Sequence, residues 1–247
     1  WPYPVRPGAR YADRPLAEIL ETTHLAPTPW PEHSSVKEVV LPFGRFPGTD
    51  VLLGPEMRST GEVMSFGNNF PESFAKAQIA ARNPLPTSGT VLVSLADRDK
   101  REGTALVAQL YDMGFEIVAT QGTARVLQAM GIPAQTVLKV GEGRPDVVDL
   151  IAQGQVHLVV DTPSSAQGRG ARPEPPLPPG AEERGIPLHL TGKRTVGYRI
   201  RTAALNYHVP YITTLVALRT AVAAIRSLCT GCLPVRALGE IVGRESA

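Results

Sequence analysis

Several residues in this chain have the donor groups and positive charges that could hold a phosphate. The turn Thr120-Gln121-Gly122-Thr123 lies between a predicted strand and a predicted helix. Its glycine lets a ligand approach the backbone, its threonine hydroxyls can donate hydrogen bonds, and a helix start offers unpaired N–H groups. Lys100 and Lys139, in neighbouring loops, would add charge-assisted hydrogen bonds. The spacing alone fits an ordinary capped helix start with surface lysines equally well.

These residues are expected at one edge of a parallel sheet. From Gly89 onward, short apolar runs alternate with amphipathic stretches, a pattern typical of βαβ units with helices on both faces of the sheet. The predicted strands are 91–95, 116–120, 136–140, 156–160 and 211–215, and the predicted helices are 100–113, 122–130, 145–153, 199–207 and 215–228. The predicted fold class is therefore α/β, a three-layer sandwich with a parallel sheet. Ligands of such sheets bind at the carboxyl ends of the strands, where Asp161 and Thr162 would join the turn and the lysines.

The chain before this alternation has a different character. Residues 1–35 are rich in proline and polar residues, and we interpret them as a connector or the edge of a truncated domain. Strands are predicted at 36–43 and 61–64, and a helix capped by Asn69 at 69–82. The predicted divisions are 1–35, 36–86 and 87–247, the last with a proline-rich insert at 163–192.

Composition excludes several classes of protein. The 247 residues include 25 basic and 23 acidic ones, a net charge of +2, whereas a dedicated nucleic-acid binder usually shows a clustered basic excess. No apolar run approaches the roughly 18 residues of a membrane helix, and residues 1–10 do not resemble a signal peptide. Because the chain begins with Trp1, we expect its N-terminus to lie upstream, and we expect a cytoplasmic location.

Cys229 and Cys232 form a C-x-x-C pair, which is typical of a redox couple or of half a zinc site. The pair follows a predicted helix instead of starting one, so the thiols gain nothing from a helix dipole. The second half of a zinc site is absent from the sequence. We favour a turn with two incidental thiols and predict no metal site.

Residues 36–64, VKEVVLPFGRFPGTDVLLGPEMRSTGEVM, resemble the end of the second ATP-grasp unit in the large subunit of carbamoyl-phosphate synthetases. The sequence after Met64 is similar to the methylglyoxal-synthase-like regulatory domain that follows in that family. Its Asp-Lys, Ala-Thr-x-Gly-Thr-Ala and Lys-Val-x-Glu-Gly-Arg-Pro motifs match Asp99-Lys100, Ala119–Ala124 and Lys139–Pro145. The resemblance covers roughly residues 36–228.

The resemblance implies that the pocket binds a nucleoside monophosphate effector, UMP or IMP. The implied effector-binding residues are Lys100, Thr120, Gly122, Thr123, Lys139, Asp161 and Thr162. Lys100 and the two threonines of the turn would contact the phosphate, and Lys139 would lie over the ribose or phosphate.

Two departures from the family's motifs bear on the identity of the effector. Asp161 stands where relatives often have Asn, and a carboxylate would repel a phosphate; the family's Ile-Arg-Arg motif reads Ile200-Arg201-Thr202.

The family also has an ornithine activator site between its last synthetase unit and the regulatory domain. The matching residues here are Glu38, Leu41 and Thr213. For the isolated chain we slightly favour the simpler interpretation, in which Glu38 is a solvent-facing strand residue and Thr213 a hydroxyl in a sheet.

The resemblance implies that the chain is the C-terminal allosteric portion of an enzyme that makes carbamoyl phosphate from bicarbonate and glutamine-derived ammonia, for pyrimidine and arginine biosynthesis. Its partners would be the rest of the large chain and a glutaminase small subunit. ATP and Mg²⁺ would belong to the parent enzyme, because residues 1–35 lack the family's Glu-x-Asn-Pro-Arg segment and no Walker-type motif is present. We therefore predict no catalytic residue, no cofactor and no activity for this chain alone.

A methylglyoxal synthase acting on dihydroxyacetone phosphate is the alternative, because it shares the fold and the phosphate pocket. That family uses an Asp after paired glycines as general base. The corresponding segment here reads Gly143-Arg144-Pro145, with Asp146 the nearest carboxylate in sequence.

Overall fold

The computed structural model describes residues 10–11, 14–15, 33–40, 61–163, 196–231 and 233–237. The chain divides into two compact units, Trp1–Glu32 and His33–Ala247. In the first unit, two short antiparallel strands are described, β1 (Arg10–Tyr11) and β2 (Arg14–Pro15). The predictions for Leu41, for Cys232 and for the proline-rich insert beyond Pro163 fall outside the described residues.

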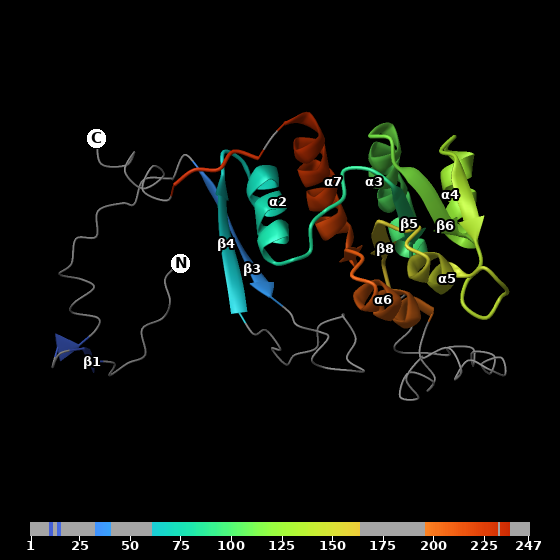
Figure 1. Ribbon diagram of the computed structural model, residues 1–247, viewed down its shortest axis with the longest axis horizontal. Coiled ribbons are helices and arrows are strands. Elements are labelled where there is room, and N and C mark those ends of the chain that lie inside the picture. The colour runs from blue at the N-terminus through green and yellow to red at the C-terminus, as the bar shows by residue number, and fades with distance from the viewer. Residues whose placement is uncertain are drawn as a thin grey trace. The chain divides into compact units, whose positions relative to one another are not determined.

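The second unit contains a five-stranded sheet, whose strands run in the order β7-β6-β5-β8-β9 and are all parallel (Figure 1). Its strands are β5 (Thr90–Ser94), β6 (Glu116–Thr120), β7 (Ala134–Val137), β8 (Leu158–Asp161) and β9 (Tyr211–Ile212). The apolar runs Val91–Val93 and Leu158–Val160 are fully buried, as expected for strands covered on both faces. The predicted parallel α/β sheet is confirmed.

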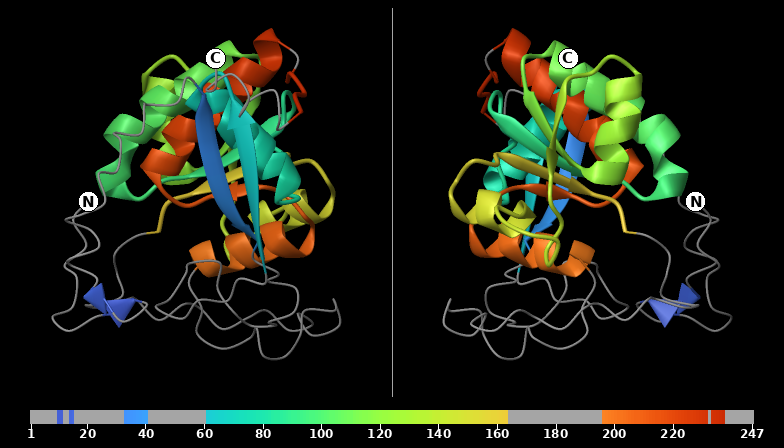
Figure 2. Two further views of the ribbon diagram at one scale, coloured as in Figure 1. Left: turned by 90° about the vertical axis from the view of Figure 1, so that its left-hand side faces the viewer. Right: turned by 90° about the vertical axis from the view of Figure 1, so that its right-hand side faces the viewer.

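Helices cover both faces of this sheet and complete three layers (Figure 2). One layer contains α3 (Lys100–Asp112), α4 (Gln121–Ala129) and α7 (Leu215–Thr230), and the other contains α5 (Val147–Ala152) and α6 (Val196–Asn206). Each layer has its own core: Val91 and Val93 of β5 pack with the first, whereas Leu92 packs with the second. The alternation along β5 thus divides its side chains between the two faces.

Two predicted boundaries near the candidate site are wrong. The strand predicted at 136–140 is β7 at Ala134–Val137, since pairing with β6 starts at Ala134 and ends at Val137. Lys139 therefore lies in the loop beyond the strand. The helix predicted from Pro145 begins at Val147, because the Asp146 carboxylate caps it by accepting hydrogen bonds from the N–H groups of Val148 and Asp149 at 2.9 and 3.0 Å.

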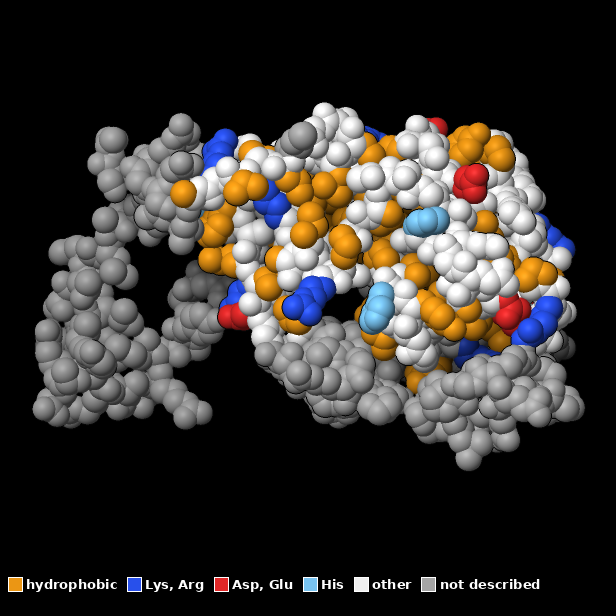
Figure 3. Space-filling view, viewed as in Figure 1, with side chains coloured by type: hydrophobic (Ala, Val, Ile, Leu, Met, Phe, Trp, Pro, Cys, Tyr) orange, Lys and Arg blue, Asp and Glu red, His pale blue; other side chains and the backbone are white. Residues whose placement is uncertain are grey.

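An antiparallel hairpin precedes the sheet in sequence. It pairs β3 (Ser34–Val40) with β4 (Gly61–Gly67), and α2 (Phe70–Ala80) covers one face of it and also packs against α7. The predicted cap is confirmed, because Asn69 Oδ1 accepts from the Glu72 N–H at 3.0 Å. Figure 3 shows hydrophobic side chains exposed over β4 and α2 on one face of the molecule. The most exposed apolar residues of these two elements are Met64, Phe70 and Ile79.

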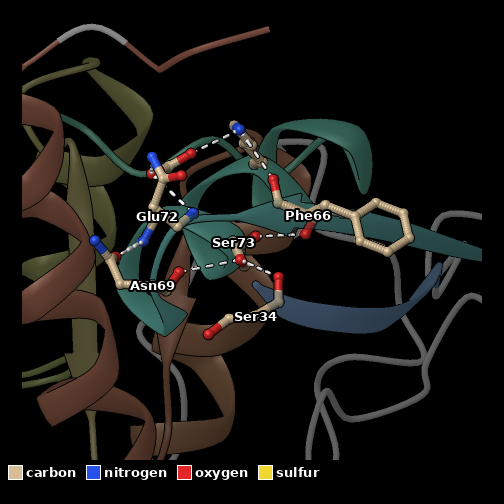
Figure 4. A network of polar contacts seen from close by, with 8 residues as sticks. Ser34, Phe66, Asn69, Glu72 and Ser73 are labelled. Carbon is tan, nitrogen blue, oxygen red and sulfur yellow. Dashed lines mark hydrogen bonds and ion pairs between the residues drawn. The ribbon is translucent and has the colours of Figure 1, made fainter. Parts of the chain in front are cut away.

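A polar network joins the hairpin to α2 (Figure 4). Ser73 Oγ lies 2.7 Å from the Ser34 carbonyl oxygen and 3.0 Å from that of Asn69. Ser65 Oγ donates to the Ser73 carbonyl at 2.5 Å. A side chain at Gly67 would come within 2.8 Å of Ser73 Oγ, so the close packing of β4 on α2 requires glycine at this position.

The Glu72 carboxylate is the charged centre of this network. It accepts from Lys76 Nζ at 2.8 Å and from the Asn68 backbone and side-chain amides at 3.2 Å. Burial alone would raise the pKa of Glu72, but the hydrogen bonds with Lys76 and Asn68 outweigh it and lower that pKa. The ionised carboxylate therefore stabilises the junction of β4 and α2.

Candidate functional site

The ends of β5, β6 and β8 lie together because the strands are parallel. Thr120 ends β6, and α4 begins at the next residue. A short 3₁₀ turn, η2 (Asp97–Asp99), follows β5 and leads into α3 at Lys100. The sheet therefore brings the predicted turn and the predicted lysine to one edge.

Lys100 lies over the first turn of α4. A side chain at Gly122 would have its Cβ 3.2 Å from Lys100 Nζ, so the missing side chain leaves room for the ammonium beside the helix start. The same ammonium forms an ion pair with Asp97 Oδ1 at 2.6 Å. The site thus combines a cation with the free N–H groups of a helix start, two features that favour an anion.

The two threonines of the turn are buried and connect α4 to β5. Thr123 Oγ1 accepts a hydrogen bond from the Leu95 N–H at 3.0 Å, and the Thr120 and Thr123 hydroxyl oxygens are 3.4 Å apart. A hydroxyl that accepts one hydrogen bond still has its own proton to donate. The threonines therefore fix the start of α4 against the end of β5 and can supply a donor there.

Thr162 makes the equivalent connection between β8 and β5. Its Oγ1 accepts from the Ala96 N–H at 2.9 Å, and its own N–H donates to the Ser94 carbonyl at 3.0 Å. The backbone leading to Lys100 is therefore held by Thr123 in the first turn of α4 and by Thr162 directly after β8.

Asp161 forms a buried ion pair with Arg201 of α6. Arg201 Nη1 lies 2.7 Å from Asp161 Oδ2, and the two side chains are only 3% and 4% exposed. A side chain at Gly197 would come within 2.9 Å of both groups, so glycine there allows α6 to approach the strand end. The carboxylate expected to repel a phosphate is thus balanced by a guanidinium.

Sequence reasoning did not include Arg201 among the site residues. The signals that could have identified it were the Ile200-Arg201-Thr202 motif and the acidic residue at a buried strand end, since a buried charge requires a partner.

Lys139 lies in the loop after β7, where its N–H donates to Glu142 Oε2 at 2.9 Å. The pKa of Asp97 is lowered, first by its hydrogen bond with Lys100 and then by the charges of Lys100 and Lys139. The two lysines therefore act on the same carboxylate.

Of the residues predicted for an activator site, Glu38 and Thr213 are described, and they belong to different parts of the fold. Glu38 lies on β3, where burial raises its pKa although a hydrogen bond with Gln78 of α2 acts in the opposite direction. Thr213 directly follows β9 and is half-buried. Glu38 is thus half-buried against α2, whereas the simpler interpretation expected a solvent-facing strand residue.

Two other predicted features have defined positions. Asp146, the carboxylate nearest to the methylglyoxal synthase motif, is buried and caps α5. The Cys229 thiol is exposed, 3.6 Å from the Thr87 carbonyl oxygen.

Across the described ranges, no group of three His, Cys, Asp or Glu side chains could hold a metal ion. The helices of the described residues include none that is long and apolar enough to span a bilayer.

Comparison with known proteins identifies the family of the sheet domain. A family model described as "MGS-like domain" matches residues 102–190. The chain carries an MGS-like domain. This confirms the methylglyoxal-synthase-like fold that the motifs predicted.

The chain as a whole is similar to one part of a longer protein. It is 55% identical over 231 residues to the carbamoyl phosphate synthase large chain of Thermotoga petrophila, and 56% identical over 231 residues to that of Thermotoga maritima. It is 46% identical over 241 residues to that of Pseudothermotoga lettingae. These matches cover 94%, 94% and 98% of this chain but 20% of each relative. The chain thus spans about a fifth of the length of these relatives and matches their C-terminal part, as residues 36–64 and the later motifs predicted.

Proposed function

We propose that this chain is the allosteric C-terminal portion of a carbamoyl phosphate synthase large chain, and that it binds a nucleoside monophosphate such as UMP or IMP. The observation that carries the proposal is the position of the Lys100 ammonium over the first turn of α4, where Gly122 leaves it room. Similarity to such large chains over 94% of the sequence supports the same function.

In this proposal the phosphate group lies between Lys100 and the start of α4. It accepts hydrogen bonds from the N–H groups of the first turn and from the Thr120 and Thr123 hydroxyls, and Lys139 adds a second positive charge or contacts the ribose. Thr162 positions the loop that leads to Lys100, since its hydroxyl accepts from the Ala96 N–H. Asp161 is compatible with a nearby phosphate because Arg201 balances its charge.

Regulation follows from differential affinity. A nucleotide shifts the population of active synthetase only if it binds one arrangement of the domains more tightly than the other. Helix α3 starts at Lys100 and is connected to α7 by the Glu102–Arg219 ion pair and by the hydrogen bond from Arg226 to Gln109. Helix α7 in turn packs on α2, which covers the hairpin. We propose these helices as the route by which the site acts on the parent enzyme.

The parent enzyme would supply the chemistry. In the proposal, ATP and Mg²⁺ bind to the rest of the large chain, a glutaminase small subunit delivers ammonia, and carbamoyl phosphate serves pyrimidine and arginine synthesis in the cytoplasm. The purified 247-residue chain is then expected to show no ATP turnover above background.

Calorimetric titration of the purified chain with UMP and with IMP tests the proposal. Lys100→Ala removes a charged donor worth about 1.5–3 kcal/mol, so binding should weaken by roughly 10- to 150-fold. Thr123→Ala should also weaken it. Lys37→Ala is the matched control, because Lys37 is a 62% exposed lysine paired with Glu62 on the hairpin. Wild-type affinity in both the Lys100 and the Thr123 variants would refute the site.

A further inference from the structure

The Asp97 carboxylate forms an ion pair with Lys100, the lysine of the proposed phosphate site. Its side chain is 95% exposed, yet its Oδ1 lies 2.6 Å from Lys100 Nζ. The neighbouring carboxylate of Asp99 is paired elsewhere, with Arg98 Nε at 3.5 Å. The 3₁₀ turn thus presents two carboxylates two residues apart, and Asp97 is the one that contacts the lysine over α4.

We infer that Asp97 is a specificity-determining residue of this site, because its carboxylate competes with incoming anions for Lys100 and so selects ligands that carry two negative charges. The inference rests on the proposed function, since it concerns the ligands of the same site.

The selection follows from the product of the charges. A dianionic phosphate attracts Lys100 about twice as strongly as a carboxylate at the same distance, so it can replace Asp97 with a net electrostatic gain. A monoanion gains nothing over the carboxylate that it replaces and still loses translational freedom on binding. The exposure of Asp97 lets the displaced carboxylate return to water, where it is well solvated.

The surrounding charges keep this competitor ionised. The hydrogen bond with Lys100 and the charges of Lys100 and Lys139 hold the pKa of Asp97 below its usual value. At neutral pH, Asp97 is therefore a full negative charge beside both lysines, and it opposes any anion that they attract together.

A different role for Asp97 predicts the opposite result. If its hydrogen bond served to aim the ammonium at α4, removal of the carboxylate charge would weaken anion binding. The sign of the change on Asp97→Asn therefore separates a competitor from a positioning residue.

The experiment is calorimetric titration of the 247-residue chain with inorganic phosphate and with nitrate, at pH 8 and constant ionic strength. Wild type should bind phosphate and show no measurable binding of nitrate. Asp97→Asn should bind phosphate about 3- to 10-fold tighter, since it removes an exposed ion pair and a nearby like charge, and should bind nitrate measurably. Asp99→Asn is the matched control: it removes the same charge two residues away and should change phosphate affinity by less than about 2-fold.

The double variant Asp97→Asn/Lys100→Ala should bind phosphate no more tightly than Lys100→Ala alone, because the competition requires the lysine. Unchanged or weaker phosphate binding in Asp97→Asn overturns the inference, as does an equal gain in Asp99→Asn. If wild type binds phosphate and Asp97→Asn does not bind it more tightly, the inference fails while the phosphate site stands. If no variant binds phosphate, the inference fails whatever the titrations with UMP show.

Discussion

The buried ion pair between Asp161 and Arg201 gives a prediction whose size follows from its geometry. It joins the end of β8 to α6 at 2.7 Å, and both side chains are at least 96% buried. Replacing one partner of such a pair removes a hydrogen-bonded counter-ion from a buried charge, which typically costs 3–5 kcal/mol. Asp161→Ala should therefore lower the free energy of unfolding by about 3–5 kcal/mol. For a chain of this length, that corresponds to a fall in Tm on the order of 10 °C.

Urea unfolding followed by circular dichroism measures this change, provided that the dependence on urea is the same for both proteins. Glu102→Ala is the control: it breaks an ion pair with Arg219 whose side chains are 52% and 69% exposed, and such pairs contribute about 1 kcal/mol or less. Adding Arg201→Met to Asp161→Ala should recover part of the loss, since the buried guanidinium is then replaced by an apolar side chain. A loss from Asp161→Ala no larger than that of the control would show that burial does not make this ion pair important for stability.

Four further predictions concern two glycines and two carboxylates. Gly122→Ala should leave the free energy of unfolding unchanged or raise it by up to about 1 kcal/mol, because alanine favours a helix. The new methyl group, 3.2 Å from Lys100 Nζ, should nevertheless weaken UMP binding several-fold. Unchanged affinity in calorimetry would count against the site. Gly67→Ala should destabilise the chain by about 1–3 kcal/mol in urea unfolding, because its Cβ would lie 2.9 Å from a backbone nitrogen of α2; a neutral result would contradict the packing. Because the pKa of Glu72 is lowered, its ionised form stabilises the fold above the unfolded-state pKa. Glu72→Gln should therefore lower the free energy of unfolding at pH 7. The difference from wild type should disappear as pH falls through the folded-state pKa of Glu72. Because burial raises the pKa of Glu38, Glu38→Gln should instead stabilise at pH 7 and converge with wild type in acid; the same sign for both variants would show that these assignments are wrong.

Much of the fold could be predicted from local sequence, because the apolar periodicity, the glycines and the capping residues that mark an element in the sequence also determine where it begins and ends in the structure. The strand predicted at 116–120 is β6 with the same ends, and the cap predicted at Asn69 is present. In these segments the apolar period, the flanking glycines and the capping residue all indicate the same boundary.

The errors occurred where non-local contacts or side-chain capping set the boundary. The strand predicted at 136–140 extends past the end of β7, because pairing with β6 stops at Val137 and leaves Leu138 40% exposed. The start of α5 depends on the Asp146 carboxylate and not on Pro145, although proline in the first turn is the commoner signal.

The sequence predicted which strand ends form the candidate site, but it predicted less well which side chains contact one another there. The parallel sheet places Lys100 beside Gly122, as the βαβ pattern required. The roles of Asp97 and Arg201 could not be inferred in the same way, since each depends on a side-chain contact. One of these contacts lies within a single turn, and the other joins residues 40 positions apart in the sequence.

Titration of the ¹⁵N-labelled chain with UMP, followed by the backbone amide resonances, shows whether a nucleotide phosphate binds between Lys100 and the start of α4. If a phosphate binds there, the Gly122 and Thr123 amides should shift saturably, together with that of Leu95, whose N–H donates to Thr123. Lys100→Ala should reduce these shifts at equal UMP concentration. Shifts confined to the hairpin of β3 and β4, with the α4 amides unmoved at saturation, would show that the nucleotide does not bind at this helix start.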